Sequence, residues 1–160
     1  MSEYSYIRYG VYVLGADGLI MPSIRTKKVK NTYVKRFQNC QHKLFKLTKC
    51  AEMLLRFLTE EMDSVNSIHN SKSFRKSFRV HMQKDCGMSY ADVTVKKAFK
   101  ELVDQDLLIS WAVKSTYTVN PMYFFCGSEK ERIALLQSLM KDAAAGNFNK
   151  GSNLKRAMKL

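Results

Sequence analysis

The segment VTVKKAFKELVDQDLL, residues 93–108, carries cationic and hydroxyl side chains on one side of an expected helix and apolar side chains on the other. Its hydrogen-bond donors are Thr94, Lys96, Lys97 and Lys100. Its apolar residues recur at helical spacing: Val95, Ala98, Phe99, Leu102 and Val103. The donors suit phosphates and base edges, whereas the apolar set predicts a buried face. The residue types therefore favour binding to nucleic acid over catalysis.

Two neighbouring segments also carry positively charged side chains. The expected helix at 72–85 places apolar side chains on one side and cations on the other. The cations expected to contact flanking phosphates are Arg75, Lys76 and Arg79. A short hairpin after residue 108 turns at Lys114 and Ser115, which are expected to touch the adjoining backbone. A lysine-rich helix face is often only a solvated face, so the interpretation depends on the three segments together.

The charge distribution supports a polyanionic partner. The chain has 27 basic and 14 acidic residues, a net charge of +13 and a pI near 9.7. Residues 25–50 hold nine basic residues and no acidic one. Because the positive charge is grouped, we expect double-stranded DNA as the partner; the alternatives are a generally basic protein or one adapted to anionic lipid. The residues of the first basic group expected to follow the DNA backbone or a minor groove are Lys30, Lys35 and Arg36.

The sequence lacks the residue patterns of common catalytic and metal sites. It has no G-x-x-x-x-G-K-[ST] phosphate loop and no His-x-His pair for metal-assisted nicking by a tyrosine. Its four cysteines form no C-x-x-C pair and its three histidines are scattered, so zinc-finger spacing is missing. We expect buried or half-buried free thiols in a reducing cytosol rather than a His–Cys nucleophile pair. We therefore expect no enzyme activity, no metal and no cofactor.

The periodicity predicts an α+β fold. The expected elements are a β-hairpin at 6–24 with its turn at 16–18, a loop with a short helix or strand at 25–46, helices at about 48–62, 72–85 and 89–106, a polar loop at 64–71, strands at 107–113 and 115–120, and a helix at 128–144. Three helices followed by a two-stranded hairpin describe a winged helix-turn-helix, in which the third helix lies in the major groove and the wing touches the backbone.

Helix ends are expected at recognisable capping residues. Thr48 is expected to cap the first helix, and Ser89 or Asp92 the third. Ser128 and Glu131 form a capping box for the last helix. Two glycines, Gly87 and Gly146, are expected to end the second and last helices. The expected apolar face of the last helix consists of Ile133, Leu136, Leu139 and Met140.

These elements divide the chain into four expected parts. Residues 1–45 are an N-terminal β-hairpin with a basic segment, and residues 46–127 are the winged helix-turn-helix domain. Residues 128–145 form a C-terminal helix, and residues 146–160 a basic tail that we expect to be disordered. The N-terminus has no signal-peptide pattern and no run of 18 apolar residues occurs, so we expect a cytoplasmic protein without membrane contact.

Two longer stretches, TVKKAFKELVDQDLLI (94–109) and YTVNPMYFFCGSEKER (117–132), resemble the RepL-type plasmid replication initiator family, winged-helix proteins of bacteria that also occur in phages. The first resembles the family's recognition helix and first wing strand. The second resembles its Tyr-x-apolar-Asn-Pro, aromatic, Gly and Arg pattern. The hairpin, NTYVKRF (31–37) and KLTKCAEMLLRFLTEEM (46–62) follow a similar order, so the resemblance covers about residues 10–140. Asp106 stands where the family often has glycine or asparagine.

The resemblance implies binding at a replication origin, with host replication proteins as further partners, in a bacterial or phage-infected cell. It implies no chemistry of the protein's own. One alternative is a winged-helix transcriptional regulator that binds promoters, often as a dimer with palindromic half-sites. Another is a phage structural or interaction protein that uses the domain for other contacts. The helix at 128–144 is expected to pack on its own domain, with a homodimer interface as the alternative.

Overall fold

The computed structural model of the chain describes residues 4–14, 20–30, 35–36, 40–63 and 65–149. The chain divides into two compact units, Met1–Tyr33 and Val34–Leu160, and each is described by itself. We expected a boundary at residue 45, but residues 34–45 belong to the second unit. The reason is burial, because Cys40 is fully buried in the core of that unit and Leu44 packs against the same core.

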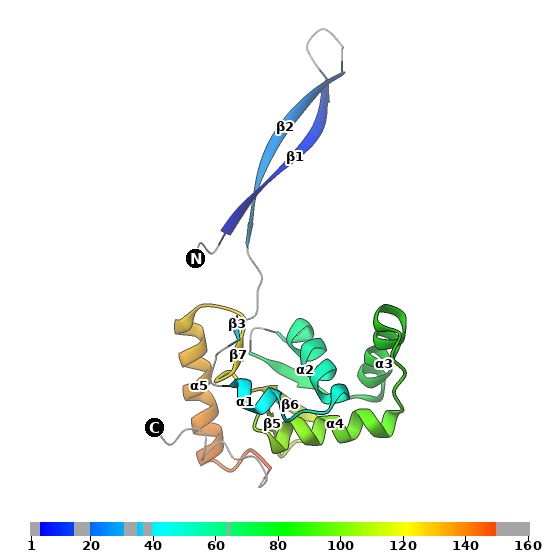
Figure 1. Cartoon of the computed structure of the whole chain (residues 1–160). Coiled ribbons are helices and arrows are strands. Elements are labelled where there is room, and N and C mark those ends of the chain that lie inside the picture. The colour runs from blue at the N-terminus through cyan, green and yellow to red at the C-terminus, as the bar shows by residue number, and fades with distance from the viewer. Residues whose placement is uncertain (1–3, 15–19, 31–34, 37–39, 64, 150–160) are drawn as a thin grey trace. The chain divides into compact units, whose positions relative to one another are not determined.

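The first unit is an antiparallel pair of long strands, β1 (Tyr4–Leu14) and β2 (Ile20–Lys30) (Figure 1). Their register runs from Tyr4 opposite Lys30 to Leu14 opposite Ile20. The expected β-hairpin is confirmed, whereas its expected turn at 16–18 lies outside the described residues. The loop expected from residue 25 is wrong for residues 25–30, because that basic stretch continues β2 by pairing with the start of β1.

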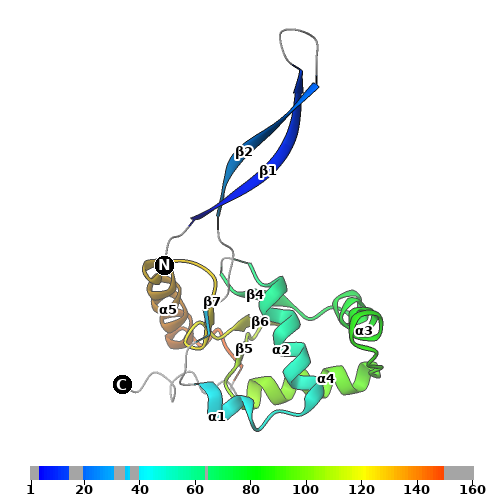
Figure 2. The same cartoon turned by 45° about the horizontal axis from the view of Figure 1, so that its top comes forward.

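The second unit is a mixed α+β fold. Its elements are β3 (Lys35–Arg36), α1 (Gln41–Leu44), α2 (Lys49–Glu61), β4 (Ser67–His69), α3 (Lys72–Cys86), α4 (Asp92–Asp104), β5 (Leu108–Ser110), β6 (Thr116–Val119), β7 (Phe124–Phe125) and α5 (Glu129–Ala144). A small antiparallel sheet has the order β4-β6-β5, and β3 pairs with β7. In both views α3 and α5 lie on opposite sides of this sheet (Figures 1 and 2). The described residues thus contain five helices and one three-stranded sheet.

The core of the second unit forms around α4. Its buried residues are Val95, Ala98, Phe99 and Leu102, so the expected apolar face is confirmed apart from Val103, which is only partly buried. Phe99 is 1% exposed and lies 5.4 Å, between ring centroids, from Tyr117 of β6. Residues buried against this face include Leu54 and Leu58 of α2 and Phe78 and Met82 of α3. One face of α4 therefore joins both preceding helices to the sheet.

The short strand β4 replaces the polar loop expected at 64–71. Ile68 is buried, and β4 pairs with β6 from Ser67 opposite Thr118 to His69 opposite Thr116. Before it, buried Asn66 has a positive φ of 56°. Its Nδ2 donates hydrogen bonds to the carbonyls of Val119 (3.0 Å) and Phe124 (2.7 Å). A strand with a single inward apolar residue shows no alternation, so the sequence pattern could not reveal it.

The caps of α2, α3 and α5 agree with the expectations. The hydroxyl of Thr48 accepts from the backbone N–H of Ala51 at the start of α2. The hydroxyl of Ser128 accepts from the backbone N–H of Glu131 at the start of α5. The Glu131 carboxylate accepts in return from the backbone N–H of Ser128. Gly87 ends α3 with a φ of +64°. Each of these residues satisfies backbone groups that the helix end would otherwise leave unpaired.

The expected cap of α4 is wrong. The N-cap residue is Ala91, which makes no side-chain cap hydrogen bond, and Asp92 is the first residue of the helix. Ser89 lies two positions outside that cap. The Asp92 carboxylate is instead occupied by Arg75 of α3, which explains why it does not fold back to cap the helix.

Asp106 directly follows Gln105, the C-cap residue of α4, and has a left-handed backbone conformation with a φ of +60°. The N–H of Asp106 donates to the Val103 carbonyl and that of Leu107 to the Leu102 carbonyl, the pair of bonds that terminates many helices at glycine. The Asp106 carboxylate accepts from Lys43 Nζ at 3.3 Å, and its carbonyl accepts from Asn120 Nδ2 at 2.8 Å. These two contacts stabilise a conformation that aspartate adopts more readily than most non-glycine residues.

The C-terminal helix packs on the sheet through fewer residues than expected. Leu139 is buried against Ile109 of β5, but Ile133 and Met140 are exposed, so the expected apolar face is only partly correct. Leu136 is half-buried, so only Ile133 and Met140 of the expected face are left exposed among the described residues.

The disordered tail expected from residue 146 is wrong for residues 146–149. Phe148 forms a β-bridge with Trp111, and the two ring centroids are 4.6 Å apart. The backbone N–H of Ala112 donates to Asn147 and that of Asn149 donates to Ser110. The segment therefore lies along the open edge of β5, where unpaired backbone groups favour an additional strand.

We expect Phe99→Ala to lower the free energy of unfolding by about 3–5 kcal/mol, because it leaves a cavity where α4 meets the sheet. Phe45→Ala is the matched control: Phe45 is 88% exposed, so its loss should change stability little. Urea denaturation of the three proteins measures both effects. Equal stability of Phe99→Ala and the wild type would contradict the described packing of α4.

Candidate nucleic-acid interface

The outward face of α4 presents lysine side chains. Lys96, Lys97 and Lys100 are exposed, as expected, whereas Thr94 is half-buried. An α-helix turns about 100° per residue, so Thr94 and Lys96 point about 160° apart around the axis. The structure therefore brings the three lysines together but separates Thr94 from Lys96.

A cleft of about 600 Å³ lies between α4, the first turns of α3 and the turn that precedes β6. Phe99 and Tyr117 are among its lining residues. Its cationic lining comes from all three elements: Lys72, Arg75, Lys96, Lys100 and Lys114. No carboxylate of the described residues forms an ion pair with Lys72, Lys100 or Lys114. The cleft is therefore positively charged at its rim and suited to an anionic group.

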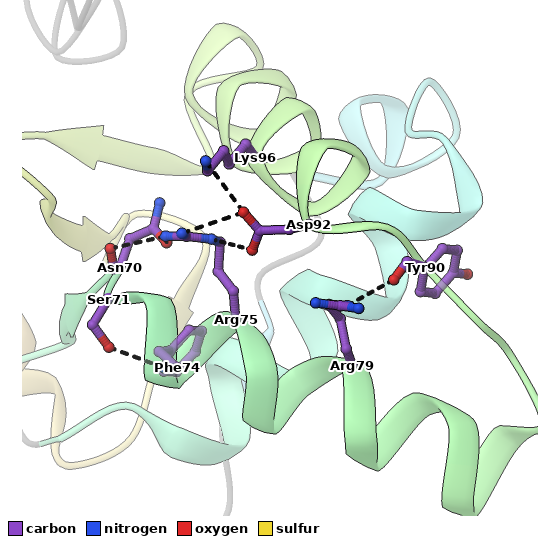
Figure 3. A network of polar contacts seen from close by, with 8 residues as sticks. All are labelled: Asn70, Ser71, Phe74, Arg75, Arg79, Tyr90, Asp92 and Lys96. Carbon is purple, nitrogen blue, oxygen red and sulfur yellow. Dashed lines mark hydrogen bonds and ion pairs between the residues drawn. The ribbon is translucent and has the colours of Figure 1, made fainter.

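Arg75 does not lie on the exposed basic face where we expected it. Its side chain is buried, with 9% of the residue exposed, and its Nε donates to Asp92 Oδ1 at 2.7 Å (Figure 3). Its Nη1 donates to Asn70 Oδ1 at 2.9 Å. Lys96 Nζ lies 3.2 Å from the second oxygen of Asp92. The guanidinium therefore connects α3, the first turn of α4 and the residue that follows β4.

Arg79 and Lys76 have different surroundings on α3. Arg79 is half-buried, and its Nε donates at 2.7 Å to the carbonyl of Tyr90 in the loop between α3 and α4 (Figure 3). Lys76 is exposed. Both line a smaller hollow of about 340 Å³, which also includes Lys72. Of the three expected cations of α3, only Lys76 is fully presented to solvent.

The turn between β5 and β6 is held without glycine. Ser115 has a φ of +62°, and its carbonyl accepts from the backbone N–H of Asn70 at 2.8 Å. The N–H of Thr116 donates to the Val113 carbonyl at 3.3 Å across the turn. Lys114 is exposed at this turn, as expected, and contributes to the rim of the cleft. The bond from Asn70 links the turn to the residue pair that precedes α3.

The expected cations of the N-terminal region lie on two different strands. Lys30 ends β2 in the first unit. Lys35 and Arg36 form β3, which pairs with Phe124 and Phe125 of β7. Arg36 lines a different hollow, between α1 and α2. Within the second unit, Arg36 therefore lines a different hollow from Lys96 and Lys100 of α4.

Three residues of this region were missed by sequence reasoning about the site. Lys72 contributes to the cleft rim, and Asn70 and Asp92 position Arg75. The sequence contained a signal for Lys72, because this residue belongs to the cationic face of the helix expected at 72–85. The sequence held no signal for Asn70 and Asp92, since neither contact with Arg75 follows the helical spacing of three or four residues.

The thiols are mostly buried, as expected. Burial raises the pKa of Cys50 to about 11, with a smaller contribution from the Glu101 carboxylate. Cys40 is buried and Cys126 half-buried, but Cys86 at the end of α3 is exposed, contrary to expectation. Among the residues that the structure describes, no three His, Cys, Asp or Glu side chains lie close enough together to bind a metal.

Comparisons of the chain with protein-family models, with curated proteins and with solved structures find no match. In the described parts of the chain, no helix combines the length and the apolar character needed to cross a membrane. Function is therefore inferred from the geometry and charge of the second unit and from the sequence patterns.

We expect acid to weaken the link between α3 and α4. The hydrogen bond from Arg75 lowers the pKa of Asp92 from its usual value near 3.8 to about 2, and Lys96 contributes further. Because the folded protein holds the carboxylate more strongly ionised than the unfolded chain, this stabilisation is present above about pH 4 and is lost as the pH falls toward 2.

The variant Asp92→Asn has no carboxylate to titrate, so its free energy of unfolding should fall less between pH 4 and pH 2 than that of the wild type. Asp104→Asn, on an exposed residue of the same helix, is the matched control and should keep the wild-type profile. Denaturant titrations at several pH values measure the difference. Parallel profiles for the wild type and Asp92→Asn would show that the pair is not part of the folded state.

Proposed function

We propose that the protein is a sequence-preferring double-stranded DNA-binding protein with a winged-helix domain, and that it initiates plasmid or phage replication at an origin. The observation that carries the DNA-binding part is the cleft beside α4, where Lys72, Lys100 and Lys114 of three elements converge and no carboxylate of the described residues pairs with them. The order α2, β4, α3, α4, β5, β6 is compatible with a winged helix, in which α4 is the recognition helix and the β5–β6 turn is the wing.

The dimensions of α4 suit a major groove. With 13 residues it is about 20 Å long, and the groove of B-DNA is wide enough, at about 12 Å, to admit one helix. Lys97 and Lys100 on its outward face would contact base edges or phosphates. Lys72, Lys96 and Lys114 around the cleft would contact the sugar–phosphate backbone that passes between α4 and the wing.

Arg75 has a different role in this proposal from the one its sequence position suggests. Because its guanidinium is occupied by Asp92 and Asn70, it positions the first turn of α4 rather than contacting phosphate. A fork of donors that binds a carboxylate through two nitrogens restrains the orientation of both helices.

The origin as target rests on the resemblance of residues 94–109 and 117–132 to RepL-type initiators. In this proposal host replication proteins are further partners. Asn120, one of the more particular residues of that resemblance, donates to the Asp106 carbonyl, and its Oδ1 accepts from the N–H of Met122. It thus supports the end of α4 and the start of the wing.

A transcriptional regulator on the same fold is the second candidate. The exposed apolar side chains of Ile133 and Met140 on α5 favour it, because a homodimer through this helix would place two α4 helices on two half-sites. Selection of bound fragments from random DNA separates the candidates: an inverted repeat favours the regulator, and a fragment that supports replication of a plasmid favours the initiator.

We expect DNA affinity to fall steeply with salt. If about five to eight phosphates are neutralised, log K should fall with log salt at a slope of roughly −4 to −7. Fluorescence anisotropy with a labelled duplex at several salt concentrations measures the slope. An affinity that does not change with salt would contradict the proposed role of the lysines.

We expect Lys114→Ala to weaken binding to all duplexes about equally and to reduce the salt slope by about one, as loss of one phosphate contact should. Lys97→Ala should instead lose about 1–3 kcal/mol mainly on the preferred sequence, if it contacts a base edge. Lys130→Ala, which removes an exposed lysine from α5, is the matched control and should bind as the wild type does.

A second measurement tests the phosphate contact directly. Duplexes with one neutral methylphosphonate at successive positions should include one on which Lys114→Ala and the wild type bind equally well. If Lys114→Ala remains weaker than the wild type at every position, the turn does not contact the backbone.

A further inference from the structure

The first turn of α4 contains one acidic residue but has no capping side chain at its start. Its N-cap residue, Ala91, is exposed and makes no side-chain cap hydrogen bond. The next residue, Asp92, accepts a hydrogen bond from Arg75 of α3 and forms an ion pair with Lys96. The two cations compensate the negative charge of its carboxylate. The third, Val93, is 61% exposed. Two exposed side chains at the start of the helix, Ala91 and Val93, are therefore small and apolar.

Neither Ala91 nor Val93 is explained by the stability of the helix. Alanine at the N-cap stabilises a helix less than serine or aspartate does, because it has no side-chain acceptor for the free backbone N–H groups. Valine has a lower helix propensity than alanine or lysine because its branched side chain loses rotamer freedom, and at 61% exposure Val93 gains little from burial. Serine or aspartate at position 91, or lysine at position 93, would stabilise the isolated helix more.

Val93 points to the same side of α4 as two of its lysines. Val93, Lys97 and Lys100 occupy positions i, i+4 and i+7 and therefore share one face of α4. All three are exposed. In a recognition helix, the residues of the N-terminal part are those that contact base edges in the major groove. Under the proposed function, Val93 would enter the groove ahead of both lysines.

We infer that Val93 is a specificity-determining residue that contacts the C5-methyl group of a pyrimidine in the major groove. Valine can neither donate nor accept a hydrogen bond, and the only apolar group on the major-groove edges of the standard base pairs is the thymine methyl. A 5-methylcytosine presents the same group at the same position. This inference rests on the proposed function, because it requires α4 to lie in the major groove.

The test uses the full chain and a duplex recovered by selection from random DNA, in which each thymine in turn is replaced by deoxyuridine. This change removes only the methyl group. At one position the wild type should lose affinity by about fourfold, the factor that corresponds to burial of one carbon group. The variant Val93→Ala should bind the unmodified duplex about as weakly as the wild type binds the uracil duplex, and should not distinguish the two.

A second pair of duplexes separates the two sources of the methyl group. At the contacted position the base pair is exchanged for one that carries cytosine or 5-methylcytosine. Tighter binding to 5-methylcytosine by the wild type, but not by Val93→Ala, shows that the methyl group itself is recognised. A preference for thymine alone shows that other features of the A·T pair contribute to the contact.

Val65→Ala is the matched control, since Val65 is 51% exposed but lies in the loop between α2 and β4. It should keep the wild-type response to uracil. Val93→Ala should fold normally, because alanine favours the helix and the site is exposed. The inference is overturned if the wild type shows no response to uracil at any position, or if Val93→Ala keeps that response. Absence of DNA binding by the wild type at low salt would overturn the proposed function, and the inference with it.

Discussion

Burial of one face of α4 is the constraint on which the second unit depends. Its four buried residues belong to the same core as residues of α2, α3 and the sheet, so the direction of the opposite face is determined by the core. Lys97 and Lys100 cannot be reoriented without disturbing the packing of Phe99 and Leu102. The lysine face of α4 therefore receives its rigidity from hydrophobic packing, to which the exposed lysine side chains contribute little.

The polar contacts around α4 act as restraints at its two ends. At the start, Arg75 joins Asp92 to Asn70, and the backbone N–H of Asn70 in turn supports the turn at Ser115. At the end, Asn120 and Lys43 hold Asp106 in its left-handed conformation. The helix, the cleft and the β5–β6 turn are thus connected through a few hydrogen bonds, which keeps the lysines of separate elements at one site.

Periodicity in the sequence predicted the long helices well. The ends of α2, α3, α4 and α5 fall within a few residues of the expected positions, because each carries a repeated apolar stripe and three of them have recognisable caps. Features that depend on partners distant in the chain were not predictable. Arg75 follows the same pattern as Lys76, and only its contact with Asp92 distinguishes a buried cation from an exposed one. Short strands such as β4 and the pairing of residues 147–149 have too few residues to show a pattern.

The contact between the C-terminal segment and β5 affects the order in which the fold can form. Phe148 and Asn149 follow Trp111 by almost forty positions, and they cover an edge whose backbone groups are otherwise open. The residues of α4 and the β5–β6 hairpin are translated before this covering segment. Any sheet that forms before residues 147–149 have docked has an unprotected edge, which can pair with another chain.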